Sequence, residues 1–185
     1  MQARDIPNLI SILRVFLTIP VVWALLAQEY GLALVLFAVA GISDGVDGFL
    51  AKHFRWESRL GGMLDPLADK TLLVFSYLAL GWLGLIPLWL VLAVILRDVI
   101  IVAGAVAYHL RVAELEAEPR LMSKVNTFMQ ILLVLLVVLS QALFALPLAL
   151  LQAVIVLVLI TTLLSGIDYI WIWSRRAVDQ GSKSD

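Results

Sequence analysis

The chain lacks cysteine altogether and has only two histidines, His53 and His109. Without cysteine it can form neither disulfides nor thiolate nucleophiles nor zinc–sulfur sites. Neither histidine lies at a metal-ligand spacing. The sequence also has no Gly-x4-Gly-Lys-Ser/Thr loop, no Gly-x-Ser-x-Gly elbow and no His-x-Lys-x4-Asp motif. These absences argue against a P-loop ATPase and a serine hydrolase, and they exclude phospholipase-D-type chemistry through a phosphohistidine.

Charged residues are scarce, and hydrophobic residues are abundant. Of 185 residues, 15% are charged and 63% are hydrophobic, and the mean hydropathy is +1.04, which is typical of an integral membrane protein. A membrane-spanning helix needs about 20 mostly apolar residues. Six segments meet this requirement, namely Ile6–Ala27, Gly31–Ala51, Gly62–Gly81, Leu85–Leu110, Leu121–Gln141 and Pro147–Trp173. Because the connections are short, we expect an all-α polytopic membrane protein, with residues 1–185 forming one six-helix bundle.

The distribution of lysine and arginine predicts the orientation of this bundle. Three of the expected loops, at residues 28–30, 82–84 and 142–146, contain no lysine or arginine. Ten of the thirteen cationic residues fall on the other side, outside the helices or close to their ends: Arg4, Lys52, Arg55, Arg59, Arg111, Arg120, Lys124, Arg175, Arg176 and Lys183. The positive-inside rule therefore places both termini in the cytoplasm. The N-terminus shows no transit segment or cleavage site, so we expect a bacterial inner membrane rather than an imported mitochondrial protein.

Four aspartates lie within or against the apolar segments, at Asp44, Asp47, Asp65 and Asp69. A carboxylate at membrane depth costs roughly 2.5–3.5 kcal/mol on insertion scales, so such residues indicate a functional site. One pair is spaced i, i+3 and the other i, i+4, so each pair shares one face of its helix. The predicted topology brings all four to the cytoplasmic side. Four convergent carboxylates suit a pair of hard divalent cations, which predicts metal-assisted chemistry on a phosphate.

Other interpretations of this stretch remain open from the residues alone. The aspartates could form a structural ion-pair network with Lys52, Lys70 and the arginines, or a cation path through a transporter. Transporters commonly show inverted repeats and broken midplane helices, and neither pattern is visible in this sequence. Four glycines lie among the aspartates, at Gly45, Gly48, Gly61 and Gly62. They fit either close helix–helix contact or the approach of a bulky ligand to the backbone.

The spacing of this stretch resembles the signature of the CDP-alcohol phosphotransferase family. The matching positions, over 26 residues, are Asp44, Asp47, Gly48, Ala51, Gly61, Asp65 and Asp69. The chain departs from the pattern at one position, where Lys52 replaces the family's arginine. This replacement keeps the charge but loses bidentate phosphate contact, so it bears on nucleotide affinity rather than on the reaction class.

The resemblance implies a mechanism. Two divalent cations, Mg²⁺ or Mn²⁺, would be held by Asp44, Asp47, Asp65 and Asp69 and would clamp the diphosphate of a CDP-linked lipid as CMP leaves. Asp69 would also deprotonate the acceptor hydroxyl, which attacks the β-phosphorus. The CDP and diphosphate pocket would be lined by Gly48, Ala51, Lys52 and Gly61. The resemblance further suggests a homodimer embedded in the lipid bilayer, and no nucleic-acid partner is expected.

The acceptor alcohol is indicated by weaker signals. Segments such as IPNLISILR, LDPLADK and LMSKVNT look most like the CMP-forming cardiolipin synthases, which join CDP-diacylglycerol to phosphatidylglycerol. The alternative acceptor is glycerol 3-phosphate, used by the phosphatidylglycerophosphate synthases; another alcohol such as inositol phosphate or serine is a further possibility. Two positions that are cationic in the glycerol 3-phosphate branch are Ala105 and Asn126 here. Arg97 and Lys124 could suffice for the single charge of phosphatidylglycerol, although Arg97 could instead pair with Asp98 or Asp168.

Overall fold

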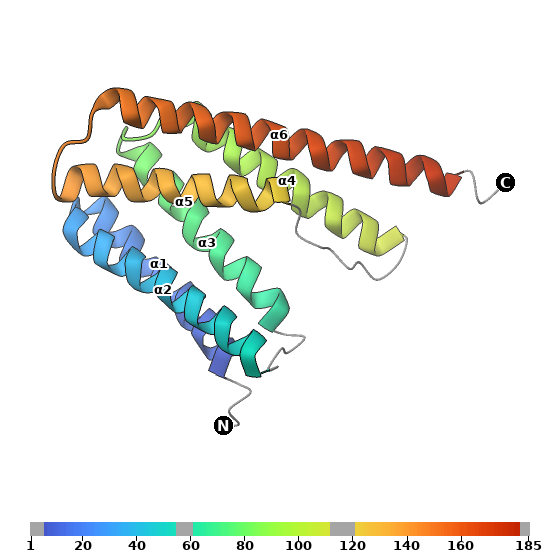
Figure 1. The fold of residues 1–185 in the computed structure, drawn as a ribbon, viewed down its shortest axis with the longest axis horizontal. Helices are drawn as coiled ribbons and strands as arrows, with labels where there is room; N and C mark the ends of the chain where they lie inside the picture. Colours follow the sequence, from blue (N-terminus) through green and yellow to red (C-terminus); the bar gives the residue numbers. More distant parts are fainter. Residues whose placement is uncertain (1–5, 55–60, 112–120, 182–185) are drawn as a thin grey trace. The chain divides into compact units, whose positions relative to one another are not determined.

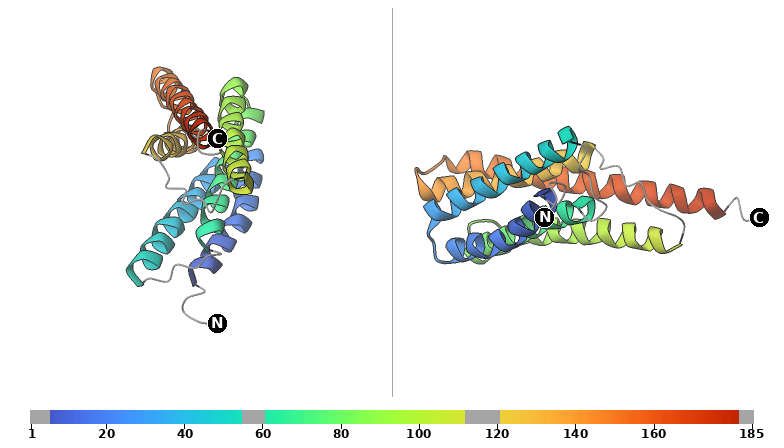
Figure 2. Two further views of the ribbon diagram at one scale, coloured as in Figure 1. Left: turned by 90° about the vertical axis from the view of Figure 1, so that its right-hand side faces the viewer. Right: turned by 90° about the horizontal axis from the view of Figure 1, so that it is seen from below.

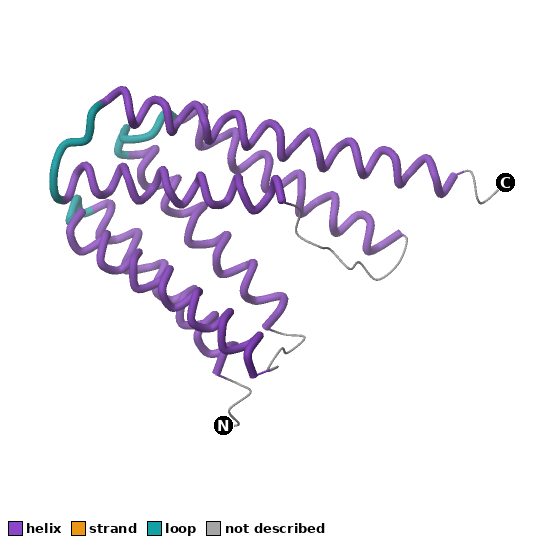
Figure 3. The backbone as a smooth tube through the Cα atoms, in the orientation of Figure 1, coloured by secondary structure: helices purple, strands orange, loops and turns teal. Residues whose placement is uncertain are grey.

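The computed structural model describes residues 6–54, 61–111 and 121–181, and within these it describes the side chains of residues 12–43, 70–103 and 121–169. Every element in the described ranges is an α-helix, and these ranges contain no strand (Figure 3). The six helices are α1 (Ile6–Leu26), α2 (Tyr30–Phe54), α3 (Gly61–Trp82), α4 (Leu88–Arg111), α5 (Leu121–Ala142) and α6 (Leu148–Gly181) (Figure 1). The predicted all-α class is confirmed.

Three predicted helix boundaries differ from the structure by three residues or more. Helix α2 was expected to end at Ala51 but ends at Phe54. Helix α4 was expected to begin at Leu85 but begins at Leu88, directly after Pro87, whose fixed φ suits the start of a helix. The Pro87 carbonyl accepts a bond from Leu90 N at 3.0 Å. Helix α6 was expected to end at Trp173 but continues to Gly181. Its 34 residues correspond to about 51 Å, well beyond the roughly 30 Å of a bilayer core.

Helices α1 and α3 end in the same way, through Schellman motifs. After α1, Glu29 N bonds to Ala24 O at 2.9 Å, and Gln28 N bonds to Leu25 O at 2.9 Å. After α3, the equivalent residue is Gly84, with φ of 72°. In both motifs one residue takes the left-handed conformation, which glycine adopts without penalty but which is uncommon for Gln28, at φ of 60°. These tight ends explain why α1 and α3 are each followed by only a short connection.

The helices gather into two compact units. The first comprises residues 1–86 and 134–146, and the second comprises residues 87–133 and 147–185. In the first unit, α1 packs against both α2 and α3. Small and large apolar side chains fill its core, with Ala24, Ala40, Tyr77 and Leu80 all fully buried. Helix α1 therefore joins the two helices that carry the aspartates.

The second unit combines α4, α6 and the first half of α5. Helices α4 and α6 run side by side, as both views in Figure 2 show. Its core is less purely apolar than that of the first unit. Beside Leu90, Val94 and Val158 it buries several polar side chains, namely Arg97, Asp98, Asn126, Gln130, Thr162 and Ser165. A polar interior within apolar helices needs a structural or functional reason.

Two of the helices are long and apolar enough to cross a membrane. They are α5, Leu121–Ala142, and the Leu148–Tyr169 part of α6. Shorter apolar stretches lie in the other described helices, among them Ile12–Leu26, Tyr30–Ser43 and Lys70–Trp82. A membrane location agrees with these lengths. Six spans and cytoplasmic termini remain predictions.

Candidate active site

The aspartate-bearing segment lies on two helices of the first unit. Asp44 and Asp47 belong to α2, and Asp65 and Asp69 belong to α3, as the sequence predicted. The side chains of these four residues lie outside the part of the chain whose side chains are described. The same holds for the four predicted pocket residues, Gly48, Ala51, Lys52 and Gly61. Their roles therefore stay predictions.

The backbone nevertheless gives this segment a definite arrangement. Both aspartate pairs lie in continuous helix, so each pair shares one helical face. The end of α2 and the start of α3 lie at the same end of the first unit (Figure 1). Among the side chains that are described elsewhere in the chain, no group of three acidic or histidine residues could hold a metal ion.

A cation is buried in the first unit, on the helix that packs against both α2 and α3. Arg14, on α1, is only 2% exposed. The carbonyl of Arg14 also accepts a hydrogen bond from the Thr18 hydroxyl at 3.2 Å. Both Arg14 and Lys70, which follows Asp69 directly on α3, have interaction partners. Two cations therefore accompany the aspartate-bearing helices, as a site for phosphate or carboxylate groups requires.

Arg97 is the centre of a buried polar network in the second unit. Its Nη1 lies 2.7 Å from Asp98 Oδ1, which is the ion pair offered above as the alternative role for this arginine. Its Nη2 donates to Ser123 Oγ on α5 at 2.9 Å and to Ser165 Oγ on α6. The guanidinium carbon lies 5.9 Å from the centroid of the Tyr169 ring. One side chain thus connects the three helices of this unit.

A second buried polar cluster lies between α5 and α6, one helical turn further along α5. Asn126, three residues after Ser123, is fully buried. Its Oδ1 accepts hydrogen bonds from the hydroxyls of Thr161 at 3.0 Å and Thr162 at 2.9 Å. Ser123 and Ser165 lie at the level of Arg97, while Asn126 contacts Thr162. A step of three residues forward on α5 therefore matches a step of three residues back on α6, so the two helices run antiparallel. Sequence reasoning singled out Asn126 for its missing charge but missed this network.

Two donors in this network have no partner among the described residues. They are Nε of Arg97 and Nδ2 of Asn126, both buried. A buried donor without an acceptor is unfavourable by about 1–3 kcal/mol, so the network can still bind an oxygen-rich group. Lys124, the other residue predicted to contact the acceptor, is exposed beside Ser123 at the start of α5. The arrangement leaves room for both roles of Arg97, helix packing and anion binding.

Comparison with known proteins identifies the family. Residues 4–169 match the family described as CDP-alcohol phosphatidyltransferase. The chain belongs to this family. The match runs through both units, from the aspartate-bearing helices to the Arg97 network. Membership of the CDP-alcohol phosphatidyltransferases, together with two helices of spanning length, makes the chain a membrane protein.

Individual relatives are similar over most of this chain. Cardiolipin synthase (CMP-forming) from Rattus norvegicus is 36% identical over 145 residues, which is 70% of this chain and 48% of the relative. The protein of the same name from Streptomyces coelicolor is 33% identical over 116 residues, 58% of this chain and 54% of the relative. A chloroplastic CDP-diacylglycerol–glycerol-3-phosphate 3-phosphatidyltransferase from Oryza sativa is 34% identical over 149 residues, 70% of this chain and 45% of the relative. The chain spans about half the length of these relatives.

Proposed function

We propose that the chain is a CMP-releasing phosphatidyltransferase that joins CDP-diacylglycerol to phosphatidylglycerol and forms cardiolipin. The observation that carries this proposal is the aspartate motif of α2 and α3 within a chain that belongs to the CDP-alcohol phosphatidyltransferase family. The similarity to CMP-forming cardiolipin synthases supports phosphatidylglycerol as the acceptor. We place the site at the cytoplasmic side of a six-span bundle that works as a homodimer.

The donor set on α2 and α3 fits divalent cations. Asp44, Asp47, Asp65 and Asp69 offer only carboxylate oxygens, which are the ligands that Mg²⁺ and Mn²⁺ prefer. When bound, two such ions would offset the charge of the diphosphate and of the departing CMP. Lys52 would contact the same diphosphate as a point charge. Gly48, Ala51 and Gly61 would let the nucleotide lie close to the backbone.

The reaction itself exchanges the phosphoanhydride bond of the diphosphate for a new phosphoester bond. The acceptor hydroxyl oxygen attacks the β-phosphorus, a new P–O bond forms, and the bridging bond to the CMP phosphate breaks. Asp69 accepts the hydroxyl proton, while the bridging oxygen leaves with CMP. A carboxylate at this position would act while the acceptor is held in line with the leaving group. The chain's contribution is therefore positioning, charge compensation and one proton transfer.

The acceptor would be held by the second unit. Phosphatidylglycerol carries one negative charge, and Arg97 retains an unpartnered Nε–H donor that could meet it. Lys124, exposed at the start of α5, would add a second cation. Glycerol 3-phosphate carries nearly two charges and favours more cationic partners. The neutral Asn126, buried one helical turn after Ser123 on α5, therefore favours the phosphodiester acceptor.

A two-substrate assay tests this proposal. Purified protein in detergent with Mg²⁺ or Mn²⁺ would receive CDP-diacylglycerol and either phosphatidylglycerol or glycerol 3-phosphate, and CMP and the lipid product would be followed. We expect cardiolipin in the first reaction, no phosphatidylglycerophosphate in the second, and no CMP in either after chelation by EDTA. Phosphatidylglycerophosphate alone would keep the mechanism but overturn the acceptor, in agreement with the rice relative. No CMP under any condition would overturn the proposal in favour of another alcohol or a cation-coupled transporter.

A further inference from the structure

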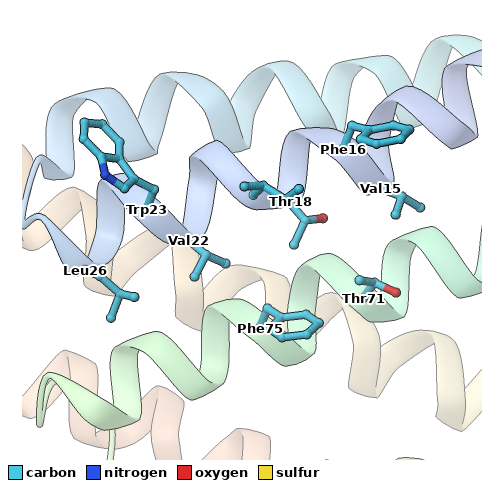
Figure 4. A pocket seen from close by; sticks show the side chains of 9 residues that line it. Val15, Phe16, Thr18, Val22, Trp23, Leu26, Thr71 and Phe75 are labelled. Atoms are coloured by element: carbon cyan, nitrogen blue, oxygen red, sulfur yellow. The ribbon is translucent and has the colours of Figure 1, made fainter.

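A groove runs along the outside of the first unit between α1 and α3. Its larger part has a volume of about 510 Å³ and extends along α1 from Val15 to Leu26, opposite Thr71 and Phe75 of α3 (Figure 4). A smaller part of about 240 Å³ continues it along α3 to Trp82. Both parts share Val22, Leu26 and Phe75, so they form one continuous feature. We call it the α1–α3 groove.

The lining of the α1–α3 groove is apolar except at Thr18 and Thr71. Phe16, Ile19 and Trp23 form an exposed rim on α1, each at least 60% exposed. The floor includes Thr18, which is only 4% exposed. Its hydroxyl is directed back to the Arg14 carbonyl at 3.2 Å, so the floor is not a hydrogen-bonding surface. The groove therefore suits a hydrocarbon and offers no specific contact to a polar ligand.

Its dimensions fit a single hydrocarbon chain. At 1.5 Å per residue, the distance from Val15 to Leu26 is about 16 Å, close to half of the roughly 30 Å core of a bilayer. The groove is open along its outer side, so a hydrocarbon chain can enter it from the surrounding lipid without passing through the core of the unit.

One end of the groove adjoins the aspartate-bearing segment. Thr71, which lines this end, follows Asp69 by two residues on α3, a rise of only about 3 Å. From there the groove runs along α3 away from the aspartates, towards Trp82. An acyl chain lying in the groove would therefore begin beside the proposed diphosphate site and extend away from it along α3.

The geometry points to an acyl-chain site: the α1–α3 groove holds one fatty acyl chain of CDP-diacylglycerol while the diphosphate lies at the aspartates. This inference rests on the proposed function, because it names how that substrate is bound. It assigns to α1, which carries no residue of the aspartate motif, a role in substrate binding. It also predicts that the enzyme discriminates between donors by chain length.

Filling the groove at its centre tests the site. Val22 lines both parts, so Val22→Phe should block the passage of a long chain. We expect kcat/KM to fall at least about tenfold with dioleoyl CDP-diacylglycerol, since loss of about two buried CH₂ groups already amounts to roughly 1.6 kcal/mol. With dioctanoyl CDP-diacylglycerol we expect a change of less than about twofold, because its short chains engage little of the groove. The matched control is Val35→Phe, at an exposed position of α2 outside the groove, which should leave turnover of both substrates unaffected.

A labelling experiment reads out the same site without turnover. CDP-diacylglycerol with a diazirine on one acyl chain would be photolysed with the full-length protein, and the labelled peptides would be identified. We expect label within residues 15–26 and 71–82, competed by unlabelled CDP-diacylglycerol and reduced by Val22→Phe. Such labelling without any transfer activity would sustain the groove while the proposed function fails. Equal labelling by a diazirine phosphatidylcholine, without competition, would mean ordinary bilayer lipid and overturn the site. Unlabelled groove peptides, as expected if a second copy covered them, would also overturn it, as would an equal loss of activity with both donor chain lengths.

Discussion

Replacing Arg97 together with Asp98 separates the two roles that the structure allows for this arginine. Arg97 Nη1 lies 2.7 Å from Asp98 Oδ1, and both side chains are at least 90% buried. Removing the arginine alone takes the cation away from a buried carboxylate, and breaking a buried pair in this way costs about 3–5 kcal/mol. Arg97→Met should therefore lower stability and activity whatever its role, so the single variant cannot distinguish them.

The double variant Arg97→Met/Asp98→Asn leaves no buried charge behind. Neutral replacement of a buried ion pair is often close to neutral for stability. We expect the temperature at which the protein loses its monodisperse gel-filtration peak to return to near the wild-type value. Transfer to phosphatidylglycerol should stay about ten- to a hundredfold low, because a hydrogen bond from a charged donor contributes roughly 1.5–3 kcal/mol. The KM for phosphatidylglycerol should rise, and that for CDP-diacylglycerol should change little.

The control for this experiment is Asp98→Asn alone. It breaks the same ion pair, so it should lower thermal stability much as Arg97→Met does. It keeps the guanidinium on Ser123 and Ser165, so the protein that remains folded should retain transfer to phosphatidylglycerol. If the double variant recovered both thermal stability and phosphatidylglycerol turnover, the acceptor role of Arg97 would be refuted. The arginine would then serve only to hold α4, α5 and α6 together.

Three further predictions address other parts of the chain. Asp69→Asn removes the proposed base, so CMP release should fall by at least about a hundredfold while gel filtration is unchanged; near-normal CMP release would exclude Asp69 from that role. Lys52→Arg restores bidentate phosphate contact, so the KM for CDP-diacylglycerol should decrease in steady-state assays, and an unchanged KM would argue against contact with the diphosphate. Asn126→Leu removes the acceptor of the Thr161 and Thr162 hydroxyls and should lower thermal stability, by about 0.6–1.7 kcal/mol for each bond lost. The exposed Gln141→Leu is its control, and equal stability of the two variants would mean that the α5–α6 bonds do not stabilise the fold.

The helices could be predicted from the sequence because long apolar runs bounded by short polar segments leave few alternatives. The boundary errors at α4 and α6 have different causes. Hydropathy does not register Pro87, which delays the start of α4. Hydropathy also ends the predicted α6 near Trp173, where the apolar residues stop. None of the following residues interrupts the helix, which continues to Gly181. Hydropathy locates a membrane span, while helix ends depend on local backbone chemistry.

The aspartate motif and the Arg97 network differ in how far the sequence reveals them. The aspartate motif lies within 26 residues, so its spacing can be read directly. The Arg97 network joins residues 26 and 68 positions apart, and its formation depends on how three helices pack. Its one local signal is small polar residues at helical spacing in otherwise apolar helices, Ser123 with Asn126 and Thr162 with Ser165. Such pairs suggest that this face of the helix is buried, but they do not identify the helix that packs against it.

Acceptor selectivity can vary in this family while the reaction with the donor stays the same. The residues proposed to bind the donor, including the aspartates and the α1–α3 groove, all lie in the first unit, whereas Arg97, Lys124 and Asn126 lie in the second. Under these proposals, substitutions in the second unit alter the KM for the acceptor alcohol without moving the carboxylates that act on the donor. A change from phosphatidylglycerol to glycerol 3-phosphate then needs added cations on α4 and α5 rather than a new catalytic centre. Similarity both to relatives named cardiolipin synthase and to one named glycerol-3-phosphate 3-phosphatidyltransferase is the outcome expected from such a division.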